Sequence, residues 1–101
     1  MKQVLISYTT KPERTEENAR LIQDVVDELK VKAPAGLRYF VLRDENGRFS
    51  HFVQIEEGAP QLNEFASFQV FQEGAGERYL EGPVRSTVTI VGSFGMLPNE
   101  C

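Results

Sequence analysis

An Asn-Gly pair between two strand-like runs constrains the fold of this chain more than any other feature. Residues 37–43 and 49–56 are rich in β-branched, aromatic and other apolar side chains, a composition typical of strands. The five residues between them, 44–48, contain Asn46-Gly47, a pair that tolerates the positive φ required by a tight turn. The sequence therefore predicts a β-hairpin, and with it an antiparallel sheet.

The N-terminal third of the chain reads as a strand followed by a helix. Residues 3–9 form a β-branched and apolar run, which predicts the first strand. Thr15 is the expected N-cap of the helix, and apolar residues then recur every three or four positions, which predicts one buried stripe. Ala33-Pro34-Ala35-Gly36 ends this helix, because proline cannot continue it.

A second helix and a last strand are predicted after the hairpin. Residues 62–73 again carry apolar side chains at helical spacing, and we expect the helix to continue to about Tyr79. Gly82-Pro83 is the expected stop, and residues 84–92 the expected last strand. The tail from Phe94 is short and rich in turn-forming residues.

The order of these elements is β-α-β-β-α-β, the ferredoxin-like arrangement of the α+β class. It places a four-stranded antiparallel sheet under two helices. A length of 101 residues is typical of one domain, so residues 1–101 are expected to form a single domain. A hydrophobic content of 41% is sufficient for a packed core.

Apolar side chains occur on both faces of the predicted strands. The helices cover one face only, yet five apolar residues fall on the opposite parity: Leu5, Phe40, Leu42, Phe52 and Val91. A sheet that is apolar on both faces usually needs a second cover. We therefore expect a homodimer packed sheet to sheet.

Composition and charge argue against several classes of function. The net charge of −4 lacks the positive footprint of a nucleic-acid-binding protein. No apolar run approaches the roughly 18 residues needed to cross a bilayer, and no signal peptide opens the chain, so we expect a cytoplasmic protein without a membrane partner. Cys101 is the only cysteine and His51 the only histidine. We therefore expect neither an internal disulfide nor a metal site.

Three polar-tipped residues share one face of the predicted sheet. His51 lies mid-strand, and its imidazole is a candidate catalytic base for a phenolic proton. Tyr8 and Tyr39 share the same parity on the first two strands, where their hydroxyls could orient a substrate. The alternative for all three is a structural role in the core.

The second helix supplies the opposite wall of this candidate cleft. Phe65, Phe68 and Gln72 are the expected substrate-binding residues on that helix. A mostly apolar pocket with a few convergent polar groups is the usual pattern of a small-molecule site. A run of phenylalanines at helical spacing is more often part of the core than of a binding site.

The chain resembles the dimeric α+β barrel superfamily, and within it the small domains related to antibiotic-biosynthesis monooxygenases. The resemblance runs from about residue 3 to residue 94, and five stretches carry it: 17–19, 34–39, 49–53, 65–72 and 88–94. It implies a ferredoxin-like subunit and a sheet-to-sheet dimer. The heme-degrading members use an Asn, Trp and His set, which this chain lacks because it has no Trp.

The resemblance also implies an activity. Characterised members include oxygenases that act on aromatic polyketides without a cofactor. We therefore expect a cofactor-independent monooxygenase that acts on a small aromatic or polyketide-like ligand, with His51 as the base. The alternative is a non-catalytic dimeric barrel that binds a small molecule or serves as an interaction module, since fold alone does not determine chemistry.

Overall fold

Four strands and two main helices build the structure, a computed structural model that describes residues 1–96. Cys101 lies outside the described residues. In chain order the elements are β1 (Lys2–Thr10), a 3-10 turn η1 (Pro12–Arg14), α1 (Thr15–Lys32), β2 (Leu37–Arg43), β3 (Arg48–Ile55), a second 3-10 turn η2 (Leu62–Glu64), α2 (Ala66–Glu73), α3 (Ala75–Arg78) and β4 (Tyr79–Thr87). The predicted β-α-β-β-α-β order and α+β class are confirmed.

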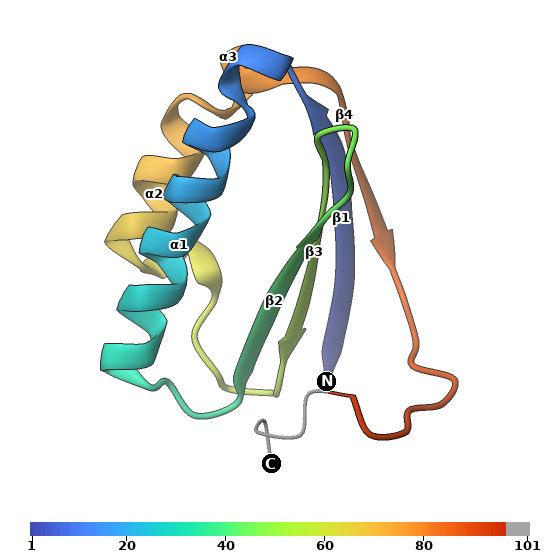
Figure 1. Ribbon diagram of the computed structural model, residues 1–101. Helices are drawn as coiled ribbons and strands as arrows, with labels where there is room; N and C mark the ends of the chain where they lie inside the picture. Colours follow the sequence, from blue (N-terminus) through green and yellow to red (C-terminus); the bar gives the residue numbers. More distant parts are fainter. Residues whose placement is uncertain (97–101) are drawn as a thin grey trace.

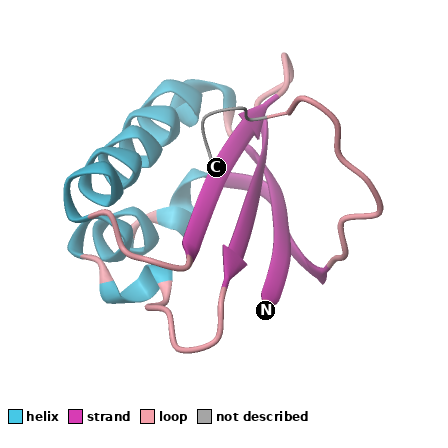
Figure 2. Cartoon of the chain, turned by 90° about the horizontal axis from the view of Figure 1, so that it is seen from below, coloured by secondary structure: helices cyan, strands magenta, loops and turns pink. Residues whose placement is uncertain are grey.

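The sheet is antiparallel throughout, with strand order β2-β3-β1-β4. The central strand β3 pairs with β1 on one side and with β2 on the other, so that His51 lies opposite Ile6 and Val41. Helices α1 and α2 cover one face of this sheet, as Figures 1 and 2 show. Residues of β3 alternate between buried and half-buried, because successive side chains point to opposite faces.

The predicted hairpin joins β2 to β3. Asp44 accepts hydrogen bonds at Oδ1 from the backbone N–H groups of Asn46 (2.8 Å) and Arg48 (3.0 Å). These bonds hold the pKa of the Asp44 carboxyl below its usual value. Gly47 has a φ of 81°, a conformation that glycine adopts without strain. The turn therefore depends on one aspartate and one glycine.

Helix α1 buries the stripe that its sequence predicts, including Ile22 and Val25. Thr15, however, is not the N-cap: the helix continues directly from η1, and Thr15 is its first residue. Its hydroxyl instead donates to the carbonyl of Lys11 at 3.2 Å and lies 2.8 Å from the Thr10 hydroxyl. The helix ends at Ala33, whose N–H donates to the carbonyl of Leu29 at 2.7 Å.

The predicted second helix is shorter than expected and is divided. Phe65 adopts an extended backbone (φ −99°, ψ 134°) between η2 and α2, and Gly74 separates α2 from α3. Leu62 and Phe65 are both buried, although neither lies in an α-helix. Their three-residue spacing resembles a helical period, but it arises here from a 3-10 turn followed by one extended residue.

Helix α2 is attached to α1 at its start. The Glu28 carboxylate of α1 accepts hydrogen bonds from both the backbone N–H (2.9 Å) and the hydroxyl of Ser67. Lys32 also donates to this carboxylate, and together these bonds lower the pKa of Glu28 to about 2. The first turn of α2 is therefore fixed against the neighbouring helix.

The last strand begins earlier and ends earlier than predicted. β4 starts at Tyr79 and ends at Thr87, so Gly82-Pro83 lies inside the strand and does not terminate a helix. Gly82 has a φ of 89° and packs directly against the backbone of Ser7 and Tyr8, where the β1–β4 register shifts. After Val88 bonds to Gln3, β1 has almost no residues left to pair. Residues 89–96 therefore leave the sheet (Figure 1).

The sheet face away from the helices carries an apolar patch. Leu5, Phe40 and Phe52 are half-buried there, and the rings of Phe40 and Phe52 lie 5.3 Å apart. Leu42 and Val84 are exposed. Val91 was expected on this face but lies beyond the end of β4 and is fully exposed. Within residues 1–96, no helix covers this face.

Candidate functional site

A histidine held between two tyrosines lies between the sheet and the helices. His51 of β3 is 4% exposed. The Tyr8 hydroxyl lies 2.7 Å from its Nε2 atom, and the Tyr39 hydroxyl lies 2.8 Å from its Nδ1 atom. The structure thus brings together the three polar residues that the strand alternation placed on one face.

Strand register explains why these side chains meet. Tyr8 pairs with Phe49 and Tyr39 with Val53, so each tyrosine is two residues diagonal to His51 on a flanking strand. Side chains in this diagonal relationship share one face, and aromatic rings are long enough to reach across it. The two phenols therefore approach the imidazole from opposite sides.

Aromatic rings surround this group. Tyr8 stacks on Phe49 with ring centroids 5.6 Å apart and lies 4.1 Å from the ring of Tyr79. Phe71 of α2 lies 5.6 Å from His51 and 5.7 Å from Phe68. The imidazole is thus enclosed by rings of the protein itself.

The helical side of the site differs in part from the sequence prediction. Phe68 is half-buried against the core, as a wall residue would be. Phe65 is buried, but its ring faces Lys32, whose Nζ atom lies 5.6 Å from the ring centroid. Gln72 is exposed. Phe71, and not Gln72, is the residue of α2 that lies beside His51.

Two further polar residues, Asn18 and Arg78, extend the group and were not predicted. Asn18 is completely buried and Arg78 is 2% exposed. Asn18 Nδ2 donates to the Tyr8 hydroxyl at 2.8 Å, and Arg78 Nε donates to Asn18 Oδ1 at 2.8 Å. The result is one chain of hydrogen bonds from Arg78 through Asn18, Tyr8 and His51 to Tyr39.

Of these two residues, only Asn18 could have been recognised from the sequence as a buried polar residue. Asn18 precedes Ile22 and Val25 by four and seven positions on the buried stripe of α1, and a polar residue on such a stripe requires a buried partner. Arg78 gave no such signal, because it lies near Tyr79, where the predicted second helix was expected to end. Its burial depends on the turn from α3 into β4.

Arg78 is stabilised without a carboxylate among its hydrogen-bond partners in residues 1–96. Its Nη2 atom donates to the carbonyl of Phe71 at 2.7 Å, and its guanidinium lies 4.8 Å from the Phe71 ring centroid. A cation over an aromatic face is attracted by the ring quadrupole. Arg78 thereby connects the end of α2 to the buried chain.

Burial sets the protonation states of the site. It lowers the pKa of His51 to about 4, so the imidazole is neutral at pH 7. Burial raises the pKa of both Tyr8 and Tyr39, so the two phenols keep their protons. Among the described residues, every buried side-chain nitrogen or oxygen has a hydrogen-bond partner. The site at pH 7 is therefore a neutral group, with both imidazole nitrogens hydrogen-bonded, next to the buried cation of Arg78.

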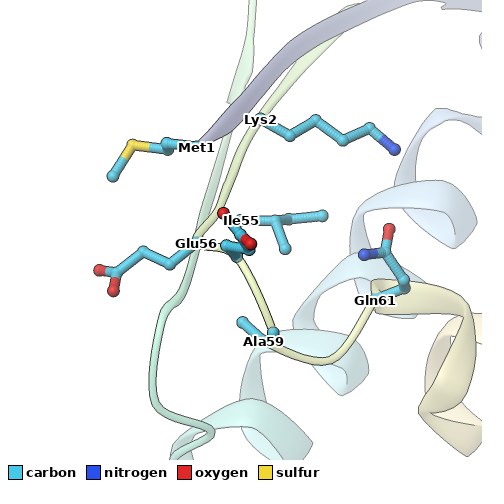
Figure 3. Close-up of a pocket in the computed structure, with 8 residues that line it drawn as sticks. Met1, Lys2, Ile55, Glu56, Ala59 and Gln61 are labelled. Carbon is cyan, nitrogen blue, oxygen red and sulfur yellow. The ribbon is translucent and has the colours of Figure 1, made fainter.

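Two surface pockets lie away from this group. One is a hollow between the start of β1, the end of β3 and the following loop (Figure 3), lined among others by Lys2, Ile55 and Gln61. The other lies beside the hairpin turn and includes Thr15 and Arg43. Neither pocket is lined by Tyr8, Tyr39 or His51.

Residues 1–96 contain no group of three or more His, Cys, Asp or Glu side chains arranged to hold a metal ion. None of the helices in that range combines the length and the apolar character needed to cross a membrane.

The chain is a ferredoxin-like α+β domain with the fold of the antibiotic-biosynthesis monooxygenase-like proteins. A solved structure from Nitrosomonas europaea, whose name assigns it provisionally to those monooxygenases, is 11% identical with a TM-score of 0.71, covering 89% of each chain. A Caulobacter crescentus structure with the same provisional name is 14% identical with a TM-score of 0.70, covering 90% of each chain.

A third structure of the same fold carries no activity in its name. It is a conserved protein from Methanosarcina mazei, 16% identical with a TM-score of 0.70, covering 86% of this chain and 89% of its own. No protein-family model and no curated protein sequence matches the chain. At these identities the similarity establishes the fold and not the chemistry of the site.

The low pKa of His51 predicts a specific loss of stability in mild acid. The unfolded chain binds a proton on this histidine below about pH 6.5, whereas the folded chain does so only near pH 4. Acidification from pH 7 to 5 therefore favours the unfolded state, and the free energy of unfolding should fall by about 2 kcal/mol. Urea titrations at the two pH values measure this difference. His51→Gln should remove it, and an equal pH dependence in that variant would contradict the assignment.

Proposed function

We propose that this chain is a monooxygenase-like protein that acts on a small aromatic ligand with an acidic phenol or activated methylene group, without a cofactor. The observation that carries the proposal is the imidazole of His51, neutral at pH 7 and hydrogen-bonded at both nitrogens to phenols. Among the buried polar residues of the described range 1–96, His51 is the one whose side chain can take up a proton. The monooxygenase names of proteins with the same fold support the class of reaction.

The chemistry begins with removal of a proton from the ligand. Because each nitrogen of His51 is hydrogen-bonded to a tyrosine hydroxyl, the proton reaches the ring through that hydroxyl. The hydroxyl takes the ligand's proton on its oxygen while giving its own hydrogen to the imidazole. The imidazolium formed in this low-dielectric interior is stabilised by the ligand anion formed in the same step.

The ligand anion then reacts with molecular oxygen. For an activated methylene the balance is R₂CH₂ + O₂ → R₂C=O + H₂O: one oxygen atom enters the ligand, and the other leaves as water with both methylene hydrogens. The ligand carbon is oxidised and O₂ is the oxidant. In this reaction the protein generates the ligand anion and excludes bulk water from the site.

The binding position is the space beneath α2. Phe68 and Phe71 now occupy this layer beside His51, and an aromatic ligand would displace one or both rings. Phe65 faces Lys32 and Gln72 is exposed, so we place the main ligand contacts on Tyr8, Tyr39 and Phe68. The ring-lined walls favour an aromatic ligand.

A second function is favoured by one specific observation. Both nitrogens of His51 already have partners within the protein, and the side chain is 4% exposed. A histidine in that state is also suited to a purely structural role in a non-catalytic domain that binds a small molecule. The two functions differ in whether removal of His51 abolishes turnover or only lowers stability.

We also propose that the chain forms a homodimer through the open face of the sheet. Leu5, Phe40 and Phe52 are the centre of that face, and the exposed side chains of Leu42 and Val84 enlarge it. Uncovered apolar area of this kind on a sheet favours association. A second copy presents the same apolar surface and leaves both helical layers outside.

Oxygen uptake with anthrone, a simple activated-methylene compound, tests the catalytic proposal. The wild-type protein should accelerate O₂ consumption above the buffer rate, with one O₂ consumed per anthraquinone formed. His51→Ala should lower the protein-dependent rate by about 100-fold or more, the usual contribution of a positioned base. Lys30→Gln, on the exposed side of α1, is the control that should keep the rate.

Two results would contradict this mechanism. If His51→Ala turned over anthrone as fast as the wild type, His51 would not be the base. If the wild-type protein bound anthrone, measured by fluorescence, without accelerating O₂ uptake, the non-catalytic alternative would hold.

Native mass spectrometry tests the homodimer. The wild-type chain should be a dimer at micromolar concentration, and Phe52→Glu should make it a monomer, because a charge would lie in the centre of the apolar face. Val70→Glu, at an exposed position on α2, is the matched control and should remain a dimer. A monomeric wild-type chain, or a dimeric Phe52→Glu variant, would overturn the proposed interface.

A further inference from the structure

We propose that Asn18, oriented by Arg78, is a positioning residue that fixes which nitrogen of His51 carries the hydrogen. The inference rests on the proposed function only for its catalytic meaning. The proton arrangement itself follows from the hydrogen-bonding capacity and the donor strength of the groups in the chain Arg78–Asn18–Tyr8–His51–Tyr39.

The orientation of the Asn18 amide is determined chemically. A guanidinium has donors and no acceptor, so the Asn18 atom 2.8 Å from Arg78 Nε has to be the oxygen, Oδ1. Nδ2 then faces the Tyr8 hydroxyl at 2.8 Å. The usual ambiguity between amide oxygen and nitrogen is therefore absent at Asn18.

This orientation decides the role of the Tyr8 hydroxyl. The amide N–H of Asn18 can only donate, so the Tyr8 oxygen accepts that bond. A hydroxyl oxygen can accept two bonds, and the Tyr79 hydroxyl is a further neighbour of the Tyr8 hydroxyl. The bond that Tyr8 accepts from Asn18, beside the Arg78 cation, polarises its O–H group and makes Tyr8 a stronger donor than Tyr39. We therefore assign the single hydrogen of Tyr8 to Nε2 of His51, 2.7 Å away. Nε2 is thus the acceptor nitrogen of the imidazole.

The remaining hydrogen of the neutral ring follows. Because Nε2 accepts, the imidazole hydrogen lies on Nδ1 and is donated to the Tyr39 oxygen, 2.8 Å away. Among residues 1–96 the Tyr39 hydroxyl has no other hydrogen-bond partner, so its own hydrogen is directed away from His51. The chain of donors thus runs in one direction, from the buried cation of Arg78 to Tyr39.

This direction assigns different roles to the two tyrosines. Tyr8 lies on the basic nitrogen and is the phenol through which a proton reaches His51. The hydrogen of the Tyr39 hydroxyl is not donated to His51, and Tyr39 would donate it to an oxygen of the ligand. The ligand class is thereby narrowed to aromatic compounds with a carbonyl or phenolate oxygen, which a Tyr39 hydroxyl can bind.

The substitution Asn18→Asp provides a nearly isosteric test. The introduced carboxylate, beside Arg78, stays ionised and only accepts hydrogen bonds. The Tyr8 hydroxyl would then donate to this carboxylate, and its oxygen could only accept from His51. The hydrogen of the imidazole should therefore move from Nδ1 to Nε2, with Tyr39 donating to Nδ1.

Long-range ¹H–¹⁵N correlation spectra of the ¹⁵N-labelled full chain at pH 7, without ligand, measure the tautomer directly. We expect mainly the Nδ1–H form in the wild type and mainly the Nε2–H form in Asn18→Asp. Asn63→Asp, the same substitution at an exposed position of η2, should leave the Nδ1–H form unchanged. Backbone amide spectra of each variant report whether the fold is retained.

An Nε2–H tautomer in the wild type would overturn the proposal, whether or not Asn18→Asp folds. An Asn18→Asp variant that folds and keeps the Nδ1–H form would also overturn it. The spectra need no substrate, so they are independent of the oxygen-uptake assay. If the spectra show the expected tautomers but the protein does not turn over anthrone, only the proposed function is contradicted. If the protein turns over anthrone but the wild type shows the Nε2–H tautomer, only this inference is contradicted.

Discussion

The two hydrogen bonds between tyrosine hydroxyls and the nitrogens of His51 constrain most of the interior. A buried imidazole without partners would cost about 1–3 kcal/mol for each unsatisfied nitrogen. Satisfying both nitrogens requires Tyr8 of β1 and Tyr39 of β2 at fixed diagonal positions. The register of the three strands and the burial of the histidine are therefore linked.

The same polar chain connects the helices to the sheet. Tyr8 needs a donor for its oxygen, which α1 supplies through Asn18, and Asn18 needs a donor for its own oxygen, which Arg78 supplies at the end of α3. Arg78 also bonds the last turn of α2 through the carbonyl of Phe71. A single hydrogen-bonded group thus fixes how α1, α2 and the start of β4 lie relative to the sheet.

Much of this arrangement could be predicted from the sequence, because it depends on local rules. The Asn46-Gly47 turn determines the hairpin, and the two-residue period of strands places Tyr8, Tyr39 and His51 on one face. What could not be predicted depends on the path of the chain between elements. Phe65 has an extended backbone, so α2 begins only at Ala66, and Phe71 lies beside His51 where Gln72 was expected. Arg78 is buried only because β4 begins at Tyr79, five residues before the predicted strand.

An NMR titration of the ¹⁵N resonances of His51 tests most directly whether it is a neutral imidazole held between two phenols. We expect two distinct nitrogen signals, one protonated and one not, that stay unchanged from pH 8 to pH 5, with a pKa near 4. A midpoint near pH 6.5, with both nitrogens becoming equivalent below it, would contradict this arrangement, because it would describe a solvent-exposed histidine without the tyrosine partners.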